Sequence, residues 1–157
     1  MANPAIRADA KADENAKAAA LRNLVNFWHT LTPQTISQLA SVYAEDATFQ
    51  DPFNSVRGIP AITHIFSDMF IRCINPKFVI TETVMEDNRA LLVWDFSFAL
   101  VSLKPNLTRK IHGTSLVRFS ADGRVESHRD YWDAAGQLYE QLPVIGAVMR
   151  WLRSRMA

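Results

Sequence analysis

The sequence predicts an α+β fold in which helices come first and a meander of long antiparallel strands follows. Residues 8–71 carry apolar side chains mostly at helical spacing, whereas residues 77–132 alternate between apolar and polar with a period of two. Turn sequences such as Ala121-Asp122-Gly123 separate the alternating segments. Because the two kinds of element occupy separate parts of the chain, we expect helices packed on one face of a curved sheet.

The length and composition indicate one globular domain with a sizeable core. The chain has 157 residues, of which 48% are hydrophobic and 21% are charged. A chain of this size buries roughly 70% of the surface that its unfolded form exposes. The formal net charge of +1 gives no general attraction to nucleic acid, so no nucleic-acid partner is expected. The single cysteine, Cys73, excludes an internal disulfide and a thiolate-based zinc site.

Three helical segments are expected before the sheet. The first spans about residues 8–31, where alanines and larger apolar residues recur at helical spacing. Thr32 and Pro33 stop this helix and begin a second, short one whose apolar side includes Tyr43. A short strand at residues 47–50 and a turn at 51–55 follow. Gly58 and Pro60 then open a third helix over residues 59–71.

Four strands and a helical tail complete the predicted order of elements. The strands are expected at residues 77–85, 90–103, 109–119 and 124–132. The tail at residues 134–155 is predicted to be helical with a break at Pro143.

Alternation along the last strands sorts the candidate pocket residues by face. Trp94 shares a face with Phe96, and His128 shares a face with Asp130 and Trp132. Burying Trp132 carries His128 and Asp130 inward, and a buried carboxylate is costly without partners. A polar pair on an apolar face therefore indicates a site, although a structural pair and an exposed pair fit the same pattern.

Two stretches carry a family resemblance. One is YAEDATFQDPF at residues 43–53, which Gly58 and a helix follow. The other is the hairpin GRV at residues 123–125 with HRDYWD at residues 128–133. Both resemble the ketosteroid isomerase and SnoaL-like polyketide cyclase group, and the second also resembles the last strand of limonene-epoxide hydrolases. All of these belong to the nuclear transport factor 2-like superfamily, and the resemblance covers about residues 20–142.

The resemblance implies a cystatin-like cone, in which a curved antiparallel sheet wraps around helices and encloses an apolar pocket. We expect a SnoaL-like domain at residues 8–142, between a flexible tail at residues 1–7 and a separate C-terminal helix at residues 143–157. Members are usually dimers, so a homodimer through the outer face of the sheet is expected. The expected pocket wall comprises Phe27, Trp28, Phe49, Phe53, Phe66, Phe70, Trp94, Phe96, Phe98, Val117 and Trp132.

The resemblance assigns a general base to Asp51. In Gln50-Asp51-Pro52, Asp51 matches the ketosteroid isomerase aspartate that moves a proton between carbons of an enone. That enzyme's oxyanion hole is a tyrosine and a protonated aspartate, and Phe27 and Ser115 occupy those positions here. Losing one such donor costs on the order of 10²-fold in rate, and Phe27 donates no hydrogen bond. The alternative role for Asp51 is capping of a turn or helix.

The resemblance to epoxide hydrolases is also incomplete. Asp130 matches one of their catalytic carboxylates. Their Arg-x-Asp partner should fall at residues 95–97, where this chain reads Asp95-Phe96-Ser97. Because the arginine is missing, a complete epoxide hydrolase triad is not expected.

Two functions are compatible with these residues. One is a cofactor-independent enzyme of isomerase, cyclase or hydratase type that acts by general acid–base chemistry on a hydrophobic carbonyl-bearing or lipid-like molecule. Its catalytic residues would be Asp51, Asp130, His128 and Ser115. The other is a non-catalytic ligand-binding or protein-interaction domain of the same fold. No cofactor is expected, and no metal, because the histidines lack the spacing of metal ligands.

The C-terminal helix is basic and amphipathic. Its apolar residues, Trp151 among them, alternate with Arg150, Arg153 and Arg155. Docking on this domain or on a dimer mate is one reading, and weak attachment to an anionic membrane surface is the other. No stretch approaches 18 uncharged apolar residues and residues 1–20 lack an apolar signal region, so a cytoplasmic location is expected.

Overall fold

The frame of the molecule is one curved sheet of six strands, in the order β2-β1-β6-β5-β4-β3. The computed structural model describes residues 4–156, with the side chains of residues 4–10 excepted. Neighbouring strands are antiparallel, apart from the parallel pair of β1 and β6. The strands are β1 (Tyr43–Gln50), β2 (Ser55–Arg57), β3 (Cys73–Glu86), β4 (Arg89–Leu100), β5 (Arg109–Phe119) and β6 (Val125–Trp132).

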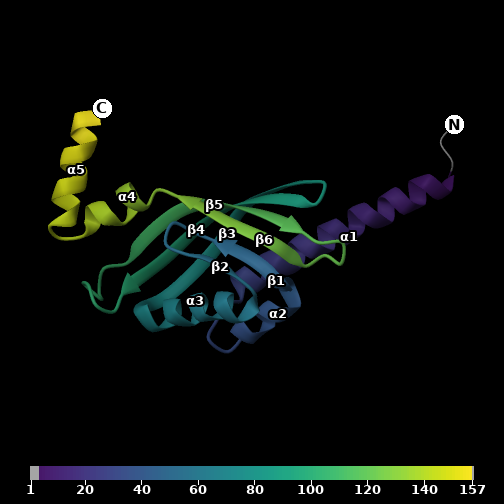
Figure 1. The fold of residues 1–157 in the computed structure, drawn as a ribbon, viewed down its shortest axis with the longest axis horizontal. Helices are drawn as coiled ribbons and strands as arrows, with labels where there is room; N and C mark the ends of the chain where they lie inside the picture. The colour runs from purple at the N-terminus through teal and green to yellow at the C-terminus, as the bar shows by residue number, and fades with distance from the viewer. Residues whose placement is uncertain (1–3, 157) are drawn as a thin grey trace.

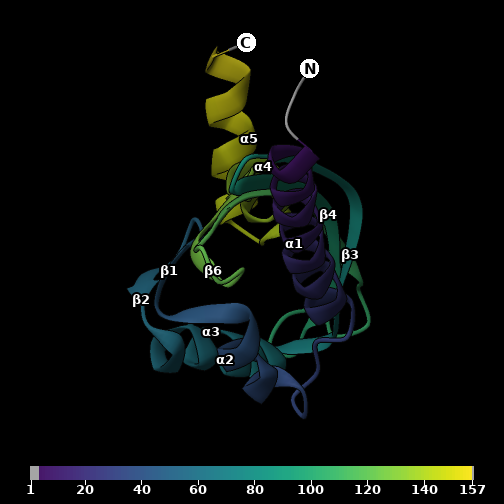
Figure 2. The same ribbon diagram turned by 90° about the vertical axis from the view of Figure 1, so that its right-hand side faces the viewer.

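Helices α1 (Pro4–His29) and α3 (Ile59–Arg72) cover the inner face of this sheet. The other helices are α2 (Leu39–Val42), α4 (Ala134–Gln137) and α5 (Ile145–Met156), with 3₁₀ turns η1 (Ile36–Gln38) and η2 (Tyr139–Gln141). The sheet curls around α1 and α3 (Figure 2), and α3 packs on both β1 and β3. Register shifts within the β3–β4 pair, between Ile74 and Lys77 and between Ile80 and Glu82, are irregularities that bend a sheet. The α+β cone that the sequence predicts is therefore confirmed.

The core lies between α1, α3 and the inner face of the sheet. Burial along β5 alternates residue by residue, as the period of two requires. The C-terminal half of α1 contributes Ala20, Leu24, Phe27 and Trp28, whereas its N-terminal half extends beyond the sheet (Figure 1). The largest fully buried side chains are Tyr43, Phe49, Leu24, Leu39, Ile62, Leu92, Val117 and Val125.

Several predicted boundaries are wrong. The first helix begins at Pro4 and not at residue 8, so only residues 1–3 of the expected tail lie outside the described residues. Tyr43, expected on the second helix, is the first residue of β1, where it pairs with Val125. The reason is that α2 lasts only four residues and Tyr43 is already extended. Strand β3 begins at Cys73, four residues before its predicted start, and β4 ends at Leu100.

The C-terminal helix α5 stands apart from the sheet (Figure 1) and packs on η2. Glu140 holds it through a 2.9 Å ion pair with Arg153 and through its carbonyl oxygen, which accepts a hydrogen bond from Arg150. Its apolar side is exposed, and Trp151 stacks under Arg155. Attachment of this face to a protein or a membrane stays a prediction. Within residues 4–156, no helix combines the length and the apolar character that crossing a membrane requires.

The outer face of the sheet is open in this single chain. Asp95 there forms ion pairs with Lys110 and His112, and Leu91 and Leu116 are exposed among these charges. The predicted homodimer through this face stays a prediction.

Candidate active site

A cavity of about 500 Å³ lies between α3 and the inner face of the sheet. Its volume falls within the range of small-molecule sites. Aromatic rings supply much of its wall, and Phe96 stacks against both Phe78 and Phe98. The lining residues from the sheet and the loop after β1 include Phe49, Asp51, Phe53, Asn54, Phe78, Trp94, Phe96, Phe98, Ile111, Asp130 and Trp132.

Seven of the eleven predicted wall residues line this cavity: Phe49, Phe53, Phe66, Trp94, Phe96, Phe98 and Trp132. The other four do not. Phe27 and Val117 are core residues, because α1 covers this end of the sheet and fills the space. Trp28 lines a separate void of about 10 Å³ behind Trp94. Phe70 is only half-buried on α3, outside the cavity wall.

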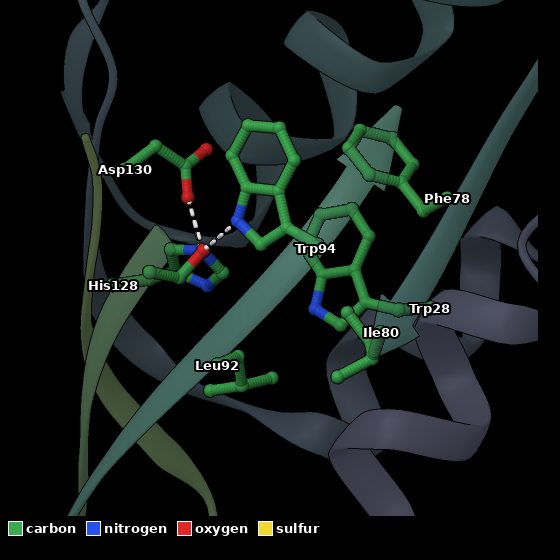
Figure 3. A pocket seen from close by; sticks show the side chains of 8 residues that line it. Trp28, Phe78, Ile80, Leu92, Trp94, His128 and Asp130 are labelled. Carbon is green, nitrogen blue, oxygen red and sulfur yellow. Dashed lines mark hydrogen bonds and ion pairs between the residues drawn. The ribbon is translucent and has the colours of Figure 1, made fainter. Parts of the chain in front are cut away.

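Asp130 is the centre of a hydrogen-bond network that extends from the cavity into the core, and Figure 3 shows the part of it around Asp130, His128 and Trp94. Its Oδ1 atom accepts a hydrogen bond from Ser115 Oγ at 2.5 Å and lies 2.8 Å from His128 Nε2. Trp94 Nε1 donates to Ser115 Oγ at 2.8 Å. On the far side, His128 Nδ1 lies 2.7 Å from Tyr43 Oη. Five side chains from four strands are thereby joined in one line.

The network directs its protons toward Asp130. A carboxylate only accepts hydrogen bonds, so His128 Nε2 carries the ring proton and Nδ1 accepts from the Tyr43 hydroxyl. Ser115 gives its one proton to Asp130 because it already accepts from Trp94. The donors therefore converge on Asp130 Oδ1 and stabilise a charged carboxylate in an apolar setting.

The two oxygens of Asp130 differ in their surroundings. Oδ2 has no hydrogen-bond partner among the residues that the structure describes, and Asp130 lines the cavity. The side chain of Asp130 is 14% exposed, against 2% for His128. His128 and Ser115 lie behind Asp130 and do not line the cavity, contrary to the prediction that they are catalytic residues facing it. Their positions make them positioning residues for Asp130.

Tyr43 is a network residue that the sequence analysis missed, because it assigned Tyr43 to a helix. Burial raises the pKa of the Tyr43 phenol well above its usual value, and the charge of Asp130 acts in the same direction. The phenol therefore stays protonated as a donor to His128. The available signal was the sequence YAEDATF itself, since an aromatic residue before an alternating segment favours a strand.

We expect Tyr43 to keep its proton in the folded protein at pH values above about 10, where a tyrosine in water loses its own, because burial raises the pKa of this phenol. In an alkaline titration followed by tyrosinate absorbance, folded wild type and Tyr43→Phe should give equal signals. The stability contribution has a defined sign: the unfolded chain releases this proton above about pH 10 while the folded state keeps it, so stability falls there. A larger tyrosinate signal from folded wild type would contradict the prediction.

Asp51 closes a turn at the mouth of the cavity. Its Oδ1 accepts hydrogen bonds from the backbone nitrogens of Phe53 at 2.7 Å and Asn54 at 2.6 Å. The Asn54 side chain adds contacts to both carboxylate oxygens at 3.0 and 2.9 Å. This is the capping role that the sequence left open, and it engages both carboxylate oxygens within the turn.

The parallel pairing of β1 and β6 nevertheless brings the two carboxylates to one place. Gln50 lies opposite Arg129, so the next residues, Asp51 and Asp130, leave the pair at the same end. Both line the cavity, and both line an adjoining hollow on the surface. The convergence of the two residues is as the sequence analysis expected, but their hydrogen bonds give them different roles.

Helix α3 adds polar residues to the cavity wall that the sequence analysis did not single out. His64, Asp68 and Arg72 follow one another at intervals of four on one side of the helix, and all line the cavity. Arg72 pairs with Asp68 at 3.2 Å. Cys73 lines the cavity too, and burial raises the pKa of its thiol. Across the described part of the chain, no three His, Cys, Asp or Glu side chains are grouped as a metal site would need.

Comparison with known proteins places the fold. The family model of the SnoaL-like domain matches residues 24–128. No curated protein matches the chain. A protein of ketosteroid isomerase-like fold from Catenulispora acidiphila, solved with trimethylamine, is similar with a TM-score of 0.64 and 15% identity, over 76% of this chain and 88% of that one.

Two further solved structures carry enzyme names. An LEH-like epoxide hydrolase from M. tuberculosis is similar with a TM-score of 0.62 and 14% identity, over 90% of this chain and 96% of that one. A protein from Jannaschia sp., assigned as a SnoaL-like polyketide cyclase, has a TM-score of 0.63 and 13% identity over 76% and 86% of the two chains. At such identities these structures show the fold alone. Because the family model matches well over half of the sequence, the chain belongs to the SnoaL-like domain family.

Proposed function

We propose that the protein is a cofactor-independent enzyme that moves a proton on a hydrophobic, carbonyl-bearing small molecule, with Asp130 as the general base. The observation that carries this proposal is that the two oxygens of the Asp130 carboxylate have different hydrogen-bond partners. Oδ1 is held by Ser115 and His128, whereas Oδ2 has no partner among the described residues and its side chain lines an apolar cavity. A positioned base in such a cavity contributes about 10²- to 10⁴-fold to a rate.

The proposed step is a proton transfer at carbon. Asp130 Oδ2 removes a proton from the carbon next to the ligand carbonyl, and the electron pair of that C–H bond passes into an enolate. The carboxyl group, now protonated, returns the proton to the same conjugated system at another carbon. The fixed hydrogen bonds to Oδ1 keep Oδ2 oriented throughout, so little reorganisation is needed during the reaction.

This proposal reassigns the base from Asp51 to Asp130. Both oxygens of the Asp51 carboxylate accept hydrogen bonds from the turn that it closes, so its contribution is to position Asn54 and the loop at the cavity mouth. Phe27, at the position of the isomerase tyrosine, is buried in the core and offers no proton to a ligand oxygen. Among the residues that line the cavity, His64 and Arg72 on α3 can donate to such an oxygen, as can the indole N–H of Trp132.

The test uses a β,γ-unsaturated ketosteroid and its monocyclic analogue, whose conversion to the conjugated enone is followed by ultraviolet absorbance. We expect Asp130→Asn to lower the rate by at least about 10²-fold, because the amide is isosteric but accepts no proton at this position. Asp51→Asn is the matched control near the same opening, and it should lower the rate far less. Turnover that survives in Asp130→Asn would remove Asp130 as the base.

The second candidate function is a non-catalytic ligand-binding domain. The observation in its favour concerns Ser115, which stands at the position of the isomerase's second oxyanion donor. Its hydroxyl donates to Asp130 and therefore not to a ligand oxygen. A binder of this kind should take up both ketones without converting either. Binding without turnover in the wild type would therefore favour this second function.

A further inference from the structure

Arg109 carries a buried guanidinium that is only partly paired. The residue is 2% exposed, at the start of β5. One nitrogen, Nη1, donates to the carbonyl oxygen of Leu107 at 3.2 Å. The other two, Nε and Nη2, are buried and have no hydrogen-bond partner among the residues that the structure describes. Arg109 also has no carboxylate in ion-pair contact there, unlike Arg57, Arg118 and Arg153.

Such an arrangement is unfavourable unless a partner completes it. A buried charge is costly without a counter-ion and hydrogen bonds. A lysine or histidine can escape this cost by losing its proton, but the guanidinium stays charged. The free protein therefore holds a cation in the core in a state that an added anion would stabilise.

The unpaired nitrogens point to the kind of anion. Nε and Nη2 form one edge of the planar guanidinium, and the two N–H groups of such an edge match the two oxygens of a carboxylate. Because Nη1 already donates to Leu107, this edge is the part of Arg109 left for recognition. The geometry thus favours a planar, bidentate acceptor over a single hydroxyl or ketone oxygen.

The position of Arg109 relates it to the cavity. Arg109 lies directly opposite Phe98 in the β4–β5 pair, and Ile111 follows two residues later on the same face. Phe98 and Ile111 both line the cavity. Arg109 itself is not among the residues that line the cavity, so a ligand reaches its unpaired edge only if the neighbouring Phe98 or Ile111 changes rotamer, as interface side chains commonly do on binding.

We propose that the ligand of this cavity is an elongated amphipathic acid whose carboxylate pairs with Nε and Nη2 of Arg109. The proposal rests on the proposed function insofar as both place a ligand in the same cavity. Ser115, which pairs with Asp130 in the β5–β6 ladder, is six residues from Arg109 along β5, a backbone distance of about 20 Å. Arg109 attracts the acid end and Asp130 repels it, so the charges orient the opposite, reactive end toward Asp130.

The test compares dodecanoate with dodecanol, which differ only in the polar end, by calorimetric titration. We expect the wild type to bind dodecanoate at least about tenfold more tightly, since hydrogen bonds to charged groups are worth about twice neutral ones. Arg109→Met should remove this preference, and Arg109→Lys should retain only part of it because the fork is lost. Acetate should not compete, because it lacks the apolar body that fills the cavity.

Arg118→Met is the matched control, since Arg118 lies on the same strand but pairs with Glu126 outside the cavity. It should keep the preference for dodecanoate. The rate at which a maleimide labels Cys73 gives a second readout, because this single cysteine lines the cavity. Bound dodecanoate should slow that labelling. Equal affinities for the two probes in the wild type, or a preference that survives in Arg109→Met, would overturn the proposal.

The unfolding temperature of Arg109→Met tests separately whether Arg109 is unpaired in the free protein. If the guanidinium is unpaired in the free protein, Arg109→Met should unfold at the wild-type temperature or above it. A clear decrease in that temperature would mean that the folded chain already pairs Arg109, and the proposal would fail. Because binding is measured without turnover, Asp130→Asn should still prefer dodecanoate, so this proposal and the proposed function can fail separately.

Discussion

Replacing His128 with leucine is expected to lower the free energy of unfolding by about 3 kcal/mol or more. The imidazole is 2% exposed and joins the Tyr43 phenol to the Asp130 carboxylate. Leucine has a similar bulk but pairs with neither group. The buried phenol would lose its acceptor, and the carboxylate would lose one of its two donors. Urea denaturation of the two proteins measures the difference directly.

His112 supplies the matched control for this substitution. Its ring pairs with Asp95 at 3.0 Å on the outer face, where its side chain is 65% exposed. His112→Leu should therefore change stability by no more than about 0.5 kcal/mol. Adding Tyr43→Phe to His128→Leu should cost less than the two single changes together, because the phenol no longer needs a partner. Full additivity of the two changes would contradict the network.

Replacing Gly113 with alanine is expected to lower the free energy of unfolding by about 1–3 kcal/mol. Inside a strand, alanine ordinarily stabilises more than glycine does. An added Cβ would lie 2.5 Å from Cη2 of Trp94 and 3.0 Å from Cβ of Trp132. Gly113 is paired with Trp94 across the β4–β5 ladder, so the indole lies over the glycine. The clash would move the indole and lengthen its hydrogen bond to Ser115. Chemical denaturation and tryptophan fluorescence measure the two effects.

A second substitution shows whether the clash is the cause. Trp94→Phe removes the two indole atoms that lie nearest to the new Cβ, so Gly113→Ala should cost much less in that background. The single Trp94→Phe change leaves a gap and frees Ser115 from its donor, and its own cost is measured alongside. An equal penalty for Gly113→Ala in both backgrounds would place the strain elsewhere.

Buried residues of the sheet hold the Asp130 carboxylate in place for the proposed proton transfer. His128 and Ser115 are buried at the ends of short, fixed hydrogen bonds, and Gly113 lets Trp94 reach Ser115. His128 and Ser115 influence Asp130 through these hydrogen bonds without facing the cavity. Each variant that loosens the network should therefore also slow turnover of the ketone probes, although the carboxylate itself is retained.

The fold was largely accessible from the sequence because periodicity survives in each element. The alternation that placed Trp94 with Phe96, and His128 with Asp130 and Trp132, depends only on the pleat of a strand. The turn at residues 121–123 depends on local chemistry and forms as expected, with Gly123 at φ +80°. Boundaries were less accessible: Tyr43 carries an aromatic ring that suits a helix face or a strand, and its pairing with Val125 decided the matter.

The alternation in the sequence determined which residues share a face of the sheet, and the family resemblance led us to expect Asp51 and Asp130 in one pocket. What only the tertiary structure decided is what each of them does. Asp51 and Asp130 are equivalent as residue types, but the backbone of the following turn occupies one and a line of buried donors holds the other with an oxygen to spare. The physical reason is that hydrogen bonds and burial are set by groups distant in the chain, which a local pattern does not encode.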